Sequence, residues 1–195
     1  DEPRGVSRYI PEGECTLTAK KLLATMNVML RGLPFIYQGQ EIGMENMEFT
    51  SMDQIDDIST IDEYQVALRA GCSEKEALDA ASAFSRDNAR TPVQWSAEKN
   101  AGFSEGEPWL GVNPNYKEIN AKQQLSDPDS IFHYYQKLIR LRKEKPVIVY
   151  GAFEALYRDH DQIFAYTRSL EGEKLLTVCN FSEHVAEMEI PEEFQ

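Results

Sequence analysis

The sequence lacks several features from which a function is commonly inferred. Its 195 residues contain no apolar run near the roughly 18 residues of a membrane span. There is no Gly-rich phosphate loop, no Gly-x-Ser-x-Gly motif and no Cys-x-x-Cys pair, so nucleotide-binding, serine-hydrolase and zinc-site interpretations lose their usual support. The three cysteines (Cys15, Cys72 and Cys179) are far apart and odd in number, which argues against a disulfide framework. The first residues also lack the apolar core of a signal peptide, so we expect reduced thiols and a cytoplasmic location.

Basic side chains are scarce. The chain has 20 Lys and Arg against 33 Asp and Glu, which gives a formal net charge of −13. Because phosphate backbones and anionic membrane surfaces are bound through Lys and Arg, nucleic acid and membranes are not expected as partners. Neutral ligands and cations remain open, although the three histidines are too widely spaced to predict a metal site. Residues 41–68 lack any basic residue and are interpreted as solvated surface; their eight carboxylates are Glu41, Glu45, Glu48, Asp53, Asp56, Asp57, Asp62 and Glu63.

The first third of the chain has a helix followed closely by an apolar segment, a pattern typical of α/β proteins. Apolar residues at helical spacing predict a helix over residues 16–30, with Gly32 placed to end it. The apolar residues 33–37 then predict a short buried strand. Two further helix starts are predicted by capping boxes, Thr60-x-x-Glu63 and Ser73-x-x-Glu76.

A long segment without periodicity, residues 85–124, follows these helices. It is rich in Asn, Gly, Pro and aromatic residues, and its aromatic content favours order over disorder. Loops of this length inside a compact domain are uncommon and are usually functional. We therefore expect functional side chains in this segment.

The last part of the chain changes from helical to strand periodicity. Residues 127–130 predict the start of a helix, with Pro128 at its first position, and Pro146 forces that helix to stop. After Gly151 the pattern predicts an antiparallel meander; its strand candidates are residues 152–157, 163–169, 174–180 and 185–190.

Carboxylate, arginine, amide and aromatic groups are concentrated in the predicted loops. They include Asp1 with Arg4, residues 37–41 and residues 86–90. Polar groups mixed with Trp and Tyr suit sugars, whose hydroxyls need hydrogen-bond partners and whose C–H faces stack on rings. The residues by themselves favour a structural interpretation instead, in which neighbouring Arg86 and Asp87 pair and Trp95 lies in the core.

Five sequence blocks carry a family resemblance. They are DEPRGVSR at residues 1–8, YQGQEIGM at 37–44, SRDNARTPVQW at 85–95, NPNYKEIN at 113–120 and DSIF at 129–132. Together they resemble the oligo-1,6-glucosidase and α-glucosidase group of the α-amylase superfamily, glycoside hydrolase family 13. The blocks occur in the order found in that family and extend over nearly the whole chain.

The resemblance implies an α/β region followed by an all-β region. Residues 1–147 would be the C-terminal portion of a (β/α)8 barrel, with a long βα insertion at about 38–125. Residues 148–195 would form a truncated C-terminal β-sandwich. The remainder of the barrel would lie in the same chain or in a second chain, so we expect this sequence to be a piece of a longer protein. The barrel architecture places catalytic groups at the C-terminal ends of its strands.

The resemblance also implies a retaining glycosidase with a carboxylate nucleophile, a carboxylic acid/base and a supporting aspartate. Asp1 matches the supporting aspartate, which stabilises the transition state. Arg90 matches the arginine that binds the terminal glucose and orients the catalytic carboxylates. The nucleophile and the acid/base would lie upstream, so this segment alone should be inactive. The chemistry requires no metal and no organic cofactor.

Two departures from the family pattern bear on the substrate. Glu2 stands where many oligo-1,6-glucosidases have Gln. Ser59 stands where those enzymes often carry a glutamate that contacts the second sugar, which leaves the choice between α-1,6 and α-1,4 linkages open.

The leading prediction is therefore an enzyme that releases glucose from the non-reducing end of short isomalto- or malto-oligosaccharides. Trehalose-6-phosphate hydrolysis and sucrose isomerisation on the same fold are the close alternatives. A non-catalytic binding module is the alternative if the chain is a standalone product.

Overall fold

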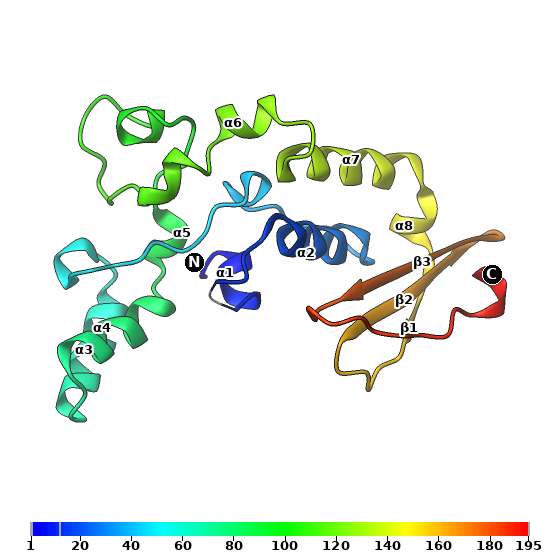
Figure 1. The fold of residues 1–195 in the computed structure, drawn as a ribbon, viewed down its shortest axis with the longest axis horizontal. Helices are drawn as coiled ribbons and strands as arrows, with labels where there is room; N and C mark the ends of the chain where they lie inside the picture. The colour runs from blue at the N-terminus through cyan, green and yellow to red at the C-terminus, as the bar shows by residue number, and fades with distance from the viewer. Residues whose placement is uncertain (1, 12, 195) are drawn as a thin grey trace. The chain divides into compact units, whose positions relative to one another are not determined.

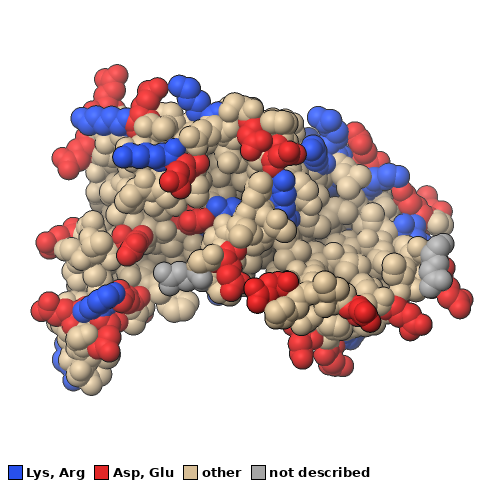
Figure 2. All heavy atoms as spheres, in the orientation of Figure 1, with Lys and Arg blue, Asp and Glu red and all other residues tan. Residues whose placement is uncertain are grey.

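The computed structural model describes residues 2–11 and 13–194. These residues divide into two compact units: one contains the described residues up to Cys15 together with Ile36–His133, and the other contains Thr16–Phe35 and the chain from Tyr134 onward. Within these described ranges, every helix is too short or too polar to cross a membrane. Acidic and basic side chains are intermixed over much of the face drawn in Figure 2, and no large basic patch is seen on it.

The first unit consists of short helices joined by extended segments (Figure 1). Its elements are α1 (Gly5–Tyr9), η1 (Gln40–Ile42), η2 (Met52–Gln54), α3 (Ile58–Arg69), α4 (Glu74–Ala83), α5 (Asp87–Arg90), η3 (Lys99–Gly102), η4 (Pro114–Lys117), α6 (Ala121–Ser126) and the start of α7 (Ile131–Glu144). Much of the segment that lacks periodicity is therefore built from single helical turns.

Helices α3 and α4 pack against each other. Of the two capping boxes predicted to start them, only one is formed. The capping box at Ser73 and Glu76 is confirmed, with both reciprocal hydrogen bonds formed. The box predicted at Thr60 is wrong, because α3 begins earlier, with Asp57 as its N-cap. Asp57 accepts hydrogen bonds from the Ser59 backbone at 3.3 Å and from the Thr60 hydroxyl at 2.9 Å, so Thr60 is bound to the cap residue instead of acting as one.

Buried hydrogen bonds join the sequence blocks that carry the family resemblance. The side chain of Gln94 is fully buried, and its Nε2 donates to Asn115 Oδ1 at 2.9 Å and to the Ile119 carbonyl at 2.7 Å. Asn113 in turn donates to the Asn46 carbonyl at 3.0 Å. These amide contacts replace a regular backbone ladder, which explains how a segment without periodicity is ordered.

Arg4 fastens the beginning of the chain to the rest of the first unit. It is only 4% exposed, and its guanidinium donates to the carbonyls of Gln38 and Asn88 and to the Thr91 hydroxyl. It also lies over the Tyr37 ring, 5.5 Å from the centroid. Burial lowers the pKa of this guanidinium. Since arginine stays charged in proteins, Arg4 is a charged anchor between three segments.

The second unit contains α2 (Leu17–Met29), the rest of α7, α8 (Pro146–Tyr150), η5 (Glu192–Phe194) and a three-stranded sheet. The helix predicted over residues 16–30 is confirmed, with the Thr16 side chain accepting a hydrogen bond from the Ala19 backbone. The strand predicted at residues 33–37 is wrong. Those residues form no ladder, and Leu33 and Phe35 are 78% and 81% exposed. A strand needs neighbouring strands to bond with, and the described residues supply none at this position.

The sheet has the order β1 (Ala152–Leu156), β2 (Ile163–Leu170) and β3 (Glu173–Asn180), with both pairs antiparallel (Figure 1). Three of the four predicted strands are thus confirmed. The fourth, at residues 185–190, is not formed; Val185 is 91% exposed, and the Glu189 carbonyl accepts a hydrogen bond from the Tyr157 hydroxyl. A side-chain contact therefore holds this segment in place of a ladder.

Helix α7 ends at Glu144, before Pro146, as predicted, and Pro146 then starts α8. The predicted start is wrong by a few residues. Pro128 lies in a turn in which Asp127 accepts from the Asp129 backbone at 2.9 Å, and α7 begins only at Ile131. The Asx turn takes up the acceptor that was expected to cap the helix.

Two arginines of the second unit bind backbone carbonyls near the ends of helices. Arg142 donates to the carbonyls of Val28 at 2.7 Å and Leu30 at 2.9 Å, at the end of α2. Arg168 is fully buried and donates to the carbonyls of Ile148 and Gly151, each at 2.6 Å. Carbonyls at the C-terminal end of a helix have no partner within it, so these cations stabilise the ends of α2 and α8.

Candidate functional site

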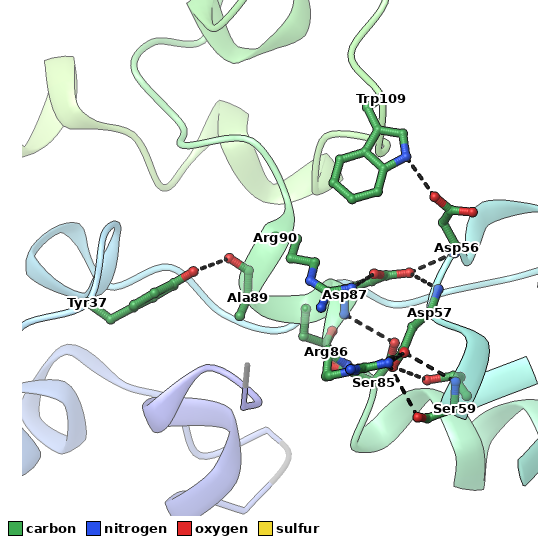
Figure 3. A network of polar contacts seen from close by, with 12 residues as sticks. Tyr37, Asp56, Asp57, Ser59, Ser85, Arg86, Asp87, Ala89, Arg90 and Trp109 are labelled. Carbon is green, nitrogen blue, oxygen red and sulfur yellow. Dashed lines mark hydrogen bonds and ion pairs between the residues drawn. The ribbon is translucent and has the colours of Figure 1, made fainter.

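A polar network in the first unit joins the start of α3 to the segment around α5 (Figure 3). We call it the Asp57–Asp87 network; its members are Asp56, Asp57, Ser59, Arg86, Asp87, Arg90 and Trp109. Two of the three site residues predicted from the sequence, Ser59 and Arg90, belong to it. The third, Asp1, lies outside the described residues.

Asp57 binds Arg86 in an ion pair whose carboxylate is buried and whose arginine side chain is 41% exposed. The carboxylate is 2% exposed and accepts from the Arg86 backbone at 3.1 Å, from Nε at 2.8 Å and from Nη2. Burial alone would raise the pKa of Asp57, but hydrogen bonds from Arg86 and from Thr60 outweigh it and hold this pKa well below its ordinary value of 3.8. Asp57 is therefore ionised at neutral pH and fixes the direction of Arg86.

Asp87 is fully buried and connects the two ends of the network. Its Oδ2 accepts from the backbone amides of Asp56 at 2.7 Å and Asp57 at 2.9 Å, and its Oδ1 lies 3.3 Å from Nη1 of Arg90. The carboxylate thus ties the loop before α3 to the arginine at the end of α5. Because each of these contacts uses a lone pair of one fixed carboxylate, the position of Arg90 depends on that of Asp87.

The two predicted substrate-binding residues lie on opposite sides of this network. Arg90 retains 26% exposure of its side chain. Ser59, in the first turn of α3, is exposed, and its hydroxyl accepts from Nη2 of Arg86 at 3.3 Å. Both side chains therefore combine access to solvent with a fixed protein contact.

The structural interpretation of this region is wrong in two respects. Arg86 binds Asp57 instead of its neighbour Asp87, because the Asp87 carboxylate is occupied by backbone amides and by Arg90. Trp95, expected in the core, is 53% exposed.

Asp57 is the main residue of the network that sequence reasoning missed. It belongs to residues 41–68, whose carboxylates were interpreted as solvated surface, and of those eight it is the one that is buried. An Asp directly before the helical pattern of residues 58–69 is the signal that could have found it, as an N-cap.

Trp109 and Tyr37 lie at the borders of the network (Figure 3). The indole Nε1 of Trp109 donates to Asp56 Oδ2 at 2.8 Å, although the side chain is 70% exposed. The Tyr37 hydroxyl donates to the Ala89 carbonyl at 3.1 Å. Two aromatic rings are thus held in place beside charged groups.

No group of three or more His, Cys, Asp or Glu side chains that could hold a metal ion occurs in the described part of the chain. The carboxylates of the network are instead bound to arginine, to backbone amides and to indole.

The chain matches two protein families in succession. Residues 1–151 match the family described as alpha amylase, catalytic domain, and residues 153–195 match the maltogenic amylase C-terminal domain. The chain therefore belongs to the α-amylase family of glycosidases, as the sequence blocks predicted.

Relatives of this chain within the family include enzymes with three different activities. The chain is 47% identical to the oligo-1,6-glucosidase of Halalkalibacterium halodurans over 99% of its own length and 34% of the relative. It superposes on a variant of the trehalose-6-phosphate hydrolase of Bacillus licheniformis with a TM-score of 0.93, at 44% identity over 99% of this chain and 35% of that one. A variant of isomaltulose synthase from Erwinia rhapontici, solved with its natural substrate sucrose, gives a TM-score of 0.88 at 45% identity over 95% of this chain and 34% of that one.

These matches settle the fold class. The chain corresponds to part of the α-amylase barrel domain followed by an antiparallel three-stranded sheet, and it spans about a third of the length of the relatives. Residues 33–37 form no strand hydrogen bonds because most strands of such a barrel belong to the other two thirds of the protein.

Proposed function

We propose that the complete protein is a retaining α-glucosidase that releases glucose from the non-reducing end of short isomalto- or malto-oligosaccharides. Residues 1–147 would supply the last part of its barrel, and residues 148–195 its C-terminal β-sandwich. The observation that carries the proposal is the Asp57–Asp87 network, which fixes Arg90 through a buried carboxylate in a chain 47% identical to an oligo-1,6-glucosidase. The nucleophile and the acid/base would lie upstream of Asp1.

Each predicted site residue has a distinct task in this proposal. Asp1 binds hydroxyls of the reacting glucose and stabilises the oxocarbenium-like transition state, in which these hydrogen bonds strengthen. Arg90 binds the terminal glucose through its planar guanidinium, and Asp87 keeps that group oriented. Ser59 faces the second sugar with a short hydroxyl where a longer carboxylate is common in relatives.

A substrate panel tests the proposal. The complete protein is assayed with isomaltose, maltose, sucrose and trehalose 6-phosphate, and kcat/KM is compared. The proposal expects isomaltose or maltose to be turned over best, with glucose released as the α-anomer. Preferred turnover of trehalose 6-phosphate, or conversion of sucrose to an isomer, would assign one of the other two activities.

Trehalose-6-phosphate hydrolysis is the second candidate because of the TM-score of 0.93 to such an enzyme. The charge distribution opposes it within this chain. Residues 41–68 have no basic side chain, and the exposed Ser59 and Asp56 lie in that stretch. Arg86 lies beside Ser59 but is paired with Asp57, so a phosphate would need a further Lys or Arg from another part of the protein.

Replacing Ser59 with glutamate tests how this position affects linkage preference. The new carboxylate would stand beside Arg86 and reach toward the second sugar, so the ratio of kcat/KM for isomaltose over maltose is expected to rise about five- to tenfold, equivalent to the net contribution of about one hydrogen bond. Ser59→Gln is the matched control, with similar size and no charge. An equal change in kcat/KM for both substrates would show that position 59 does not discriminate between the two linkages.

A further inference from the structure

Trp109 has an unusual combination of exposure and fixation. Its side chain is 70% exposed, the largest exposure among the tryptophans, yet its single polar atom is bound to Asp56 Oδ2 at 2.8 Å. Tryptophan carries a large apolar surface and normally gains stability by burying it. A ring held at one edge with its face open to solvent is therefore available to a ligand that has an apolar face.

The anchor of Trp109 is part of the candidate sugar site. Asp56 receives the indole hydrogen bond and donates its own backbone amide to Asp87 Oδ2 at 2.7 Å, while Asp87 Oδ1 lies 3.3 Å from Arg90. Only two carboxylates separate Trp109 from Arg90. In Figure 3 the indole N–H points toward Asp56, while the six-membered ring points to the side of the network where Arg90 lies. The position of this ring is thus coupled to the group proposed to bind glucose.

Other exposed or buried features of the molecule lack this combination of fixation and exposure. Cys72 is a single exposed cysteine, and the exposed apolar residues Leu33 and Phe35 belong to the segment where barrel strands are expected. Buried Arg168 is occupied by backbone carbonyls. Trp109 differs because a fixed orientation and an open apolar face occur together beside charged groups that suit sugar hydroxyls.

We propose that the indole of Trp109 is a stacking surface for a glucose unit beyond the terminal one, so that Trp109 favours oligosaccharides over substrates with a single glucose unit. The inference rests on the proposed function. The axial C–H bonds of a glucose ring give it an apolar face that fits an aromatic plane, and the carboxylate of Asp56 keeps that plane from turning. Binding through such a face contributes equally to the ground state and the transition state, so it lowers KM with little change in kcat.

The test compares substrates with one and with three glucose units. α-Glucosyl fluoride and isomaltotriose are assayed with the complete protein, unmodified and with Trp109→Ala or Trp109→Phe. For Trp109→Ala we expect kcat/KM for isomaltotriose to fall about five- to tenfold, mainly through KM, and kcat/KM for the fluoride to stay within about twofold. Trp109→Phe retains a ring and should keep most of the isomaltotriose activity.

Trp95→Ala is the matched control, because Trp95 is also exposed and lies in the same long segment, while its backbone hydrogen bonds join Ala101 and Lys122 outside the network. Trp95→Ala should leave kcat/KM for both substrates unchanged. Asp56→Ala frees the indole and should give a smaller loss of kcat/KM for isomaltotriose than Trp109→Ala does. If Trp109→Ala leaves the ratio of kcat/KM for isomaltotriose to kcat/KM for the fluoride unchanged, the stacking surface alone is overturned. An unmodified protein that hydrolyses neither substrate would overturn the proposed function, and the stacking surface with it.

Discussion

Replacing Asp1 with alanine in the complete protein is expected to lower kcat by about a hundred- to a thousandfold, with KM changing much less. The reason is the role implied by the family resemblance. A supporting aspartate accepts hydrogen bonds from sugar hydroxyls that become more acidic as positive charge develops on the ring, so its contribution is realised mainly in the transition state. Steady-state kinetics with isomaltose or maltose give both constants.

Two controls separate this loss from a general effect on folding. Asp1→Asn keeps the size of the side chain and removes the charge, so it should retain little of the activity. Asp53→Ala removes an exposed carboxylate outside the network and should leave the kinetics unchanged. The melting temperature of the Asp1→Ala variant should match that of the unmodified protein. Near-normal turnover by Asp1→Ala would remove Asp1 from the catalytic assignment.

Two helix starts were predicted correctly from a local sequence signal. Thr16 and Ser73 each accept a backbone hydrogen bond from a residue three positions later, so the start of the helix is written into a few consecutive residues. The apolar residues 33–37 carried a signal of the opposite kind. Their conformation depends on strands distant in the sequence, and no local pattern reveals whether these are present.

The candidate site was predicted only in part, for the same physical reason. Arg90 and Ser59 were found through resemblance to a family, whereas the contacts that hold them connect residues about 30 positions apart. Asp87 binds backbone amides 30 and 31 residues earlier, and Arg86 binds Asp57, which is 29 residues away. Composition alone made residues 41–68 look uniformly solvated, because an average over eight carboxylates conceals the one that is buried.

Buried polar side chains outside the Asp57–Asp87 network also hold the loops around it in place. Arg4, Asn88 and Gln94 are nearly fully buried polar side chains whose partners are mainly backbone carbonyls. Each satisfies groups that a ladder would otherwise pair. A substitution at one of these positions should therefore affect the geometry of Arg90 even without touching it.

Replacing Asp57 with alanine is expected to lower the free energy of unfolding by about 2–4 kcal/mol at pH 7, since it removes a helix cap and several hydrogen bonds to a buried carboxylate. Urea unfolding of the complete protein measures the change. Asp53→Ala, in the same acidic stretch but exposed, is the control and should stay within about 0.5 kcal/mol of the unmodified protein.

The pH dependence of this difference identifies its cause. The pKa of Asp57 is lowered in the folded protein from its ordinary value of 3.8, so the unfolded chain takes up a proton first as the pH falls. The stabilisation by ionised Asp57 is therefore complete above that ordinary value and is lost progressively below it. The unfolding free energies of the unmodified protein and of Asp57→Ala should converge as the pH is lowered from 5 toward 3, while Asp53→Ala should stay parallel to the unmodified protein. A difference that persists unchanged across this range would mean that packing, and not the charge of Asp57, holds α3 to Arg86.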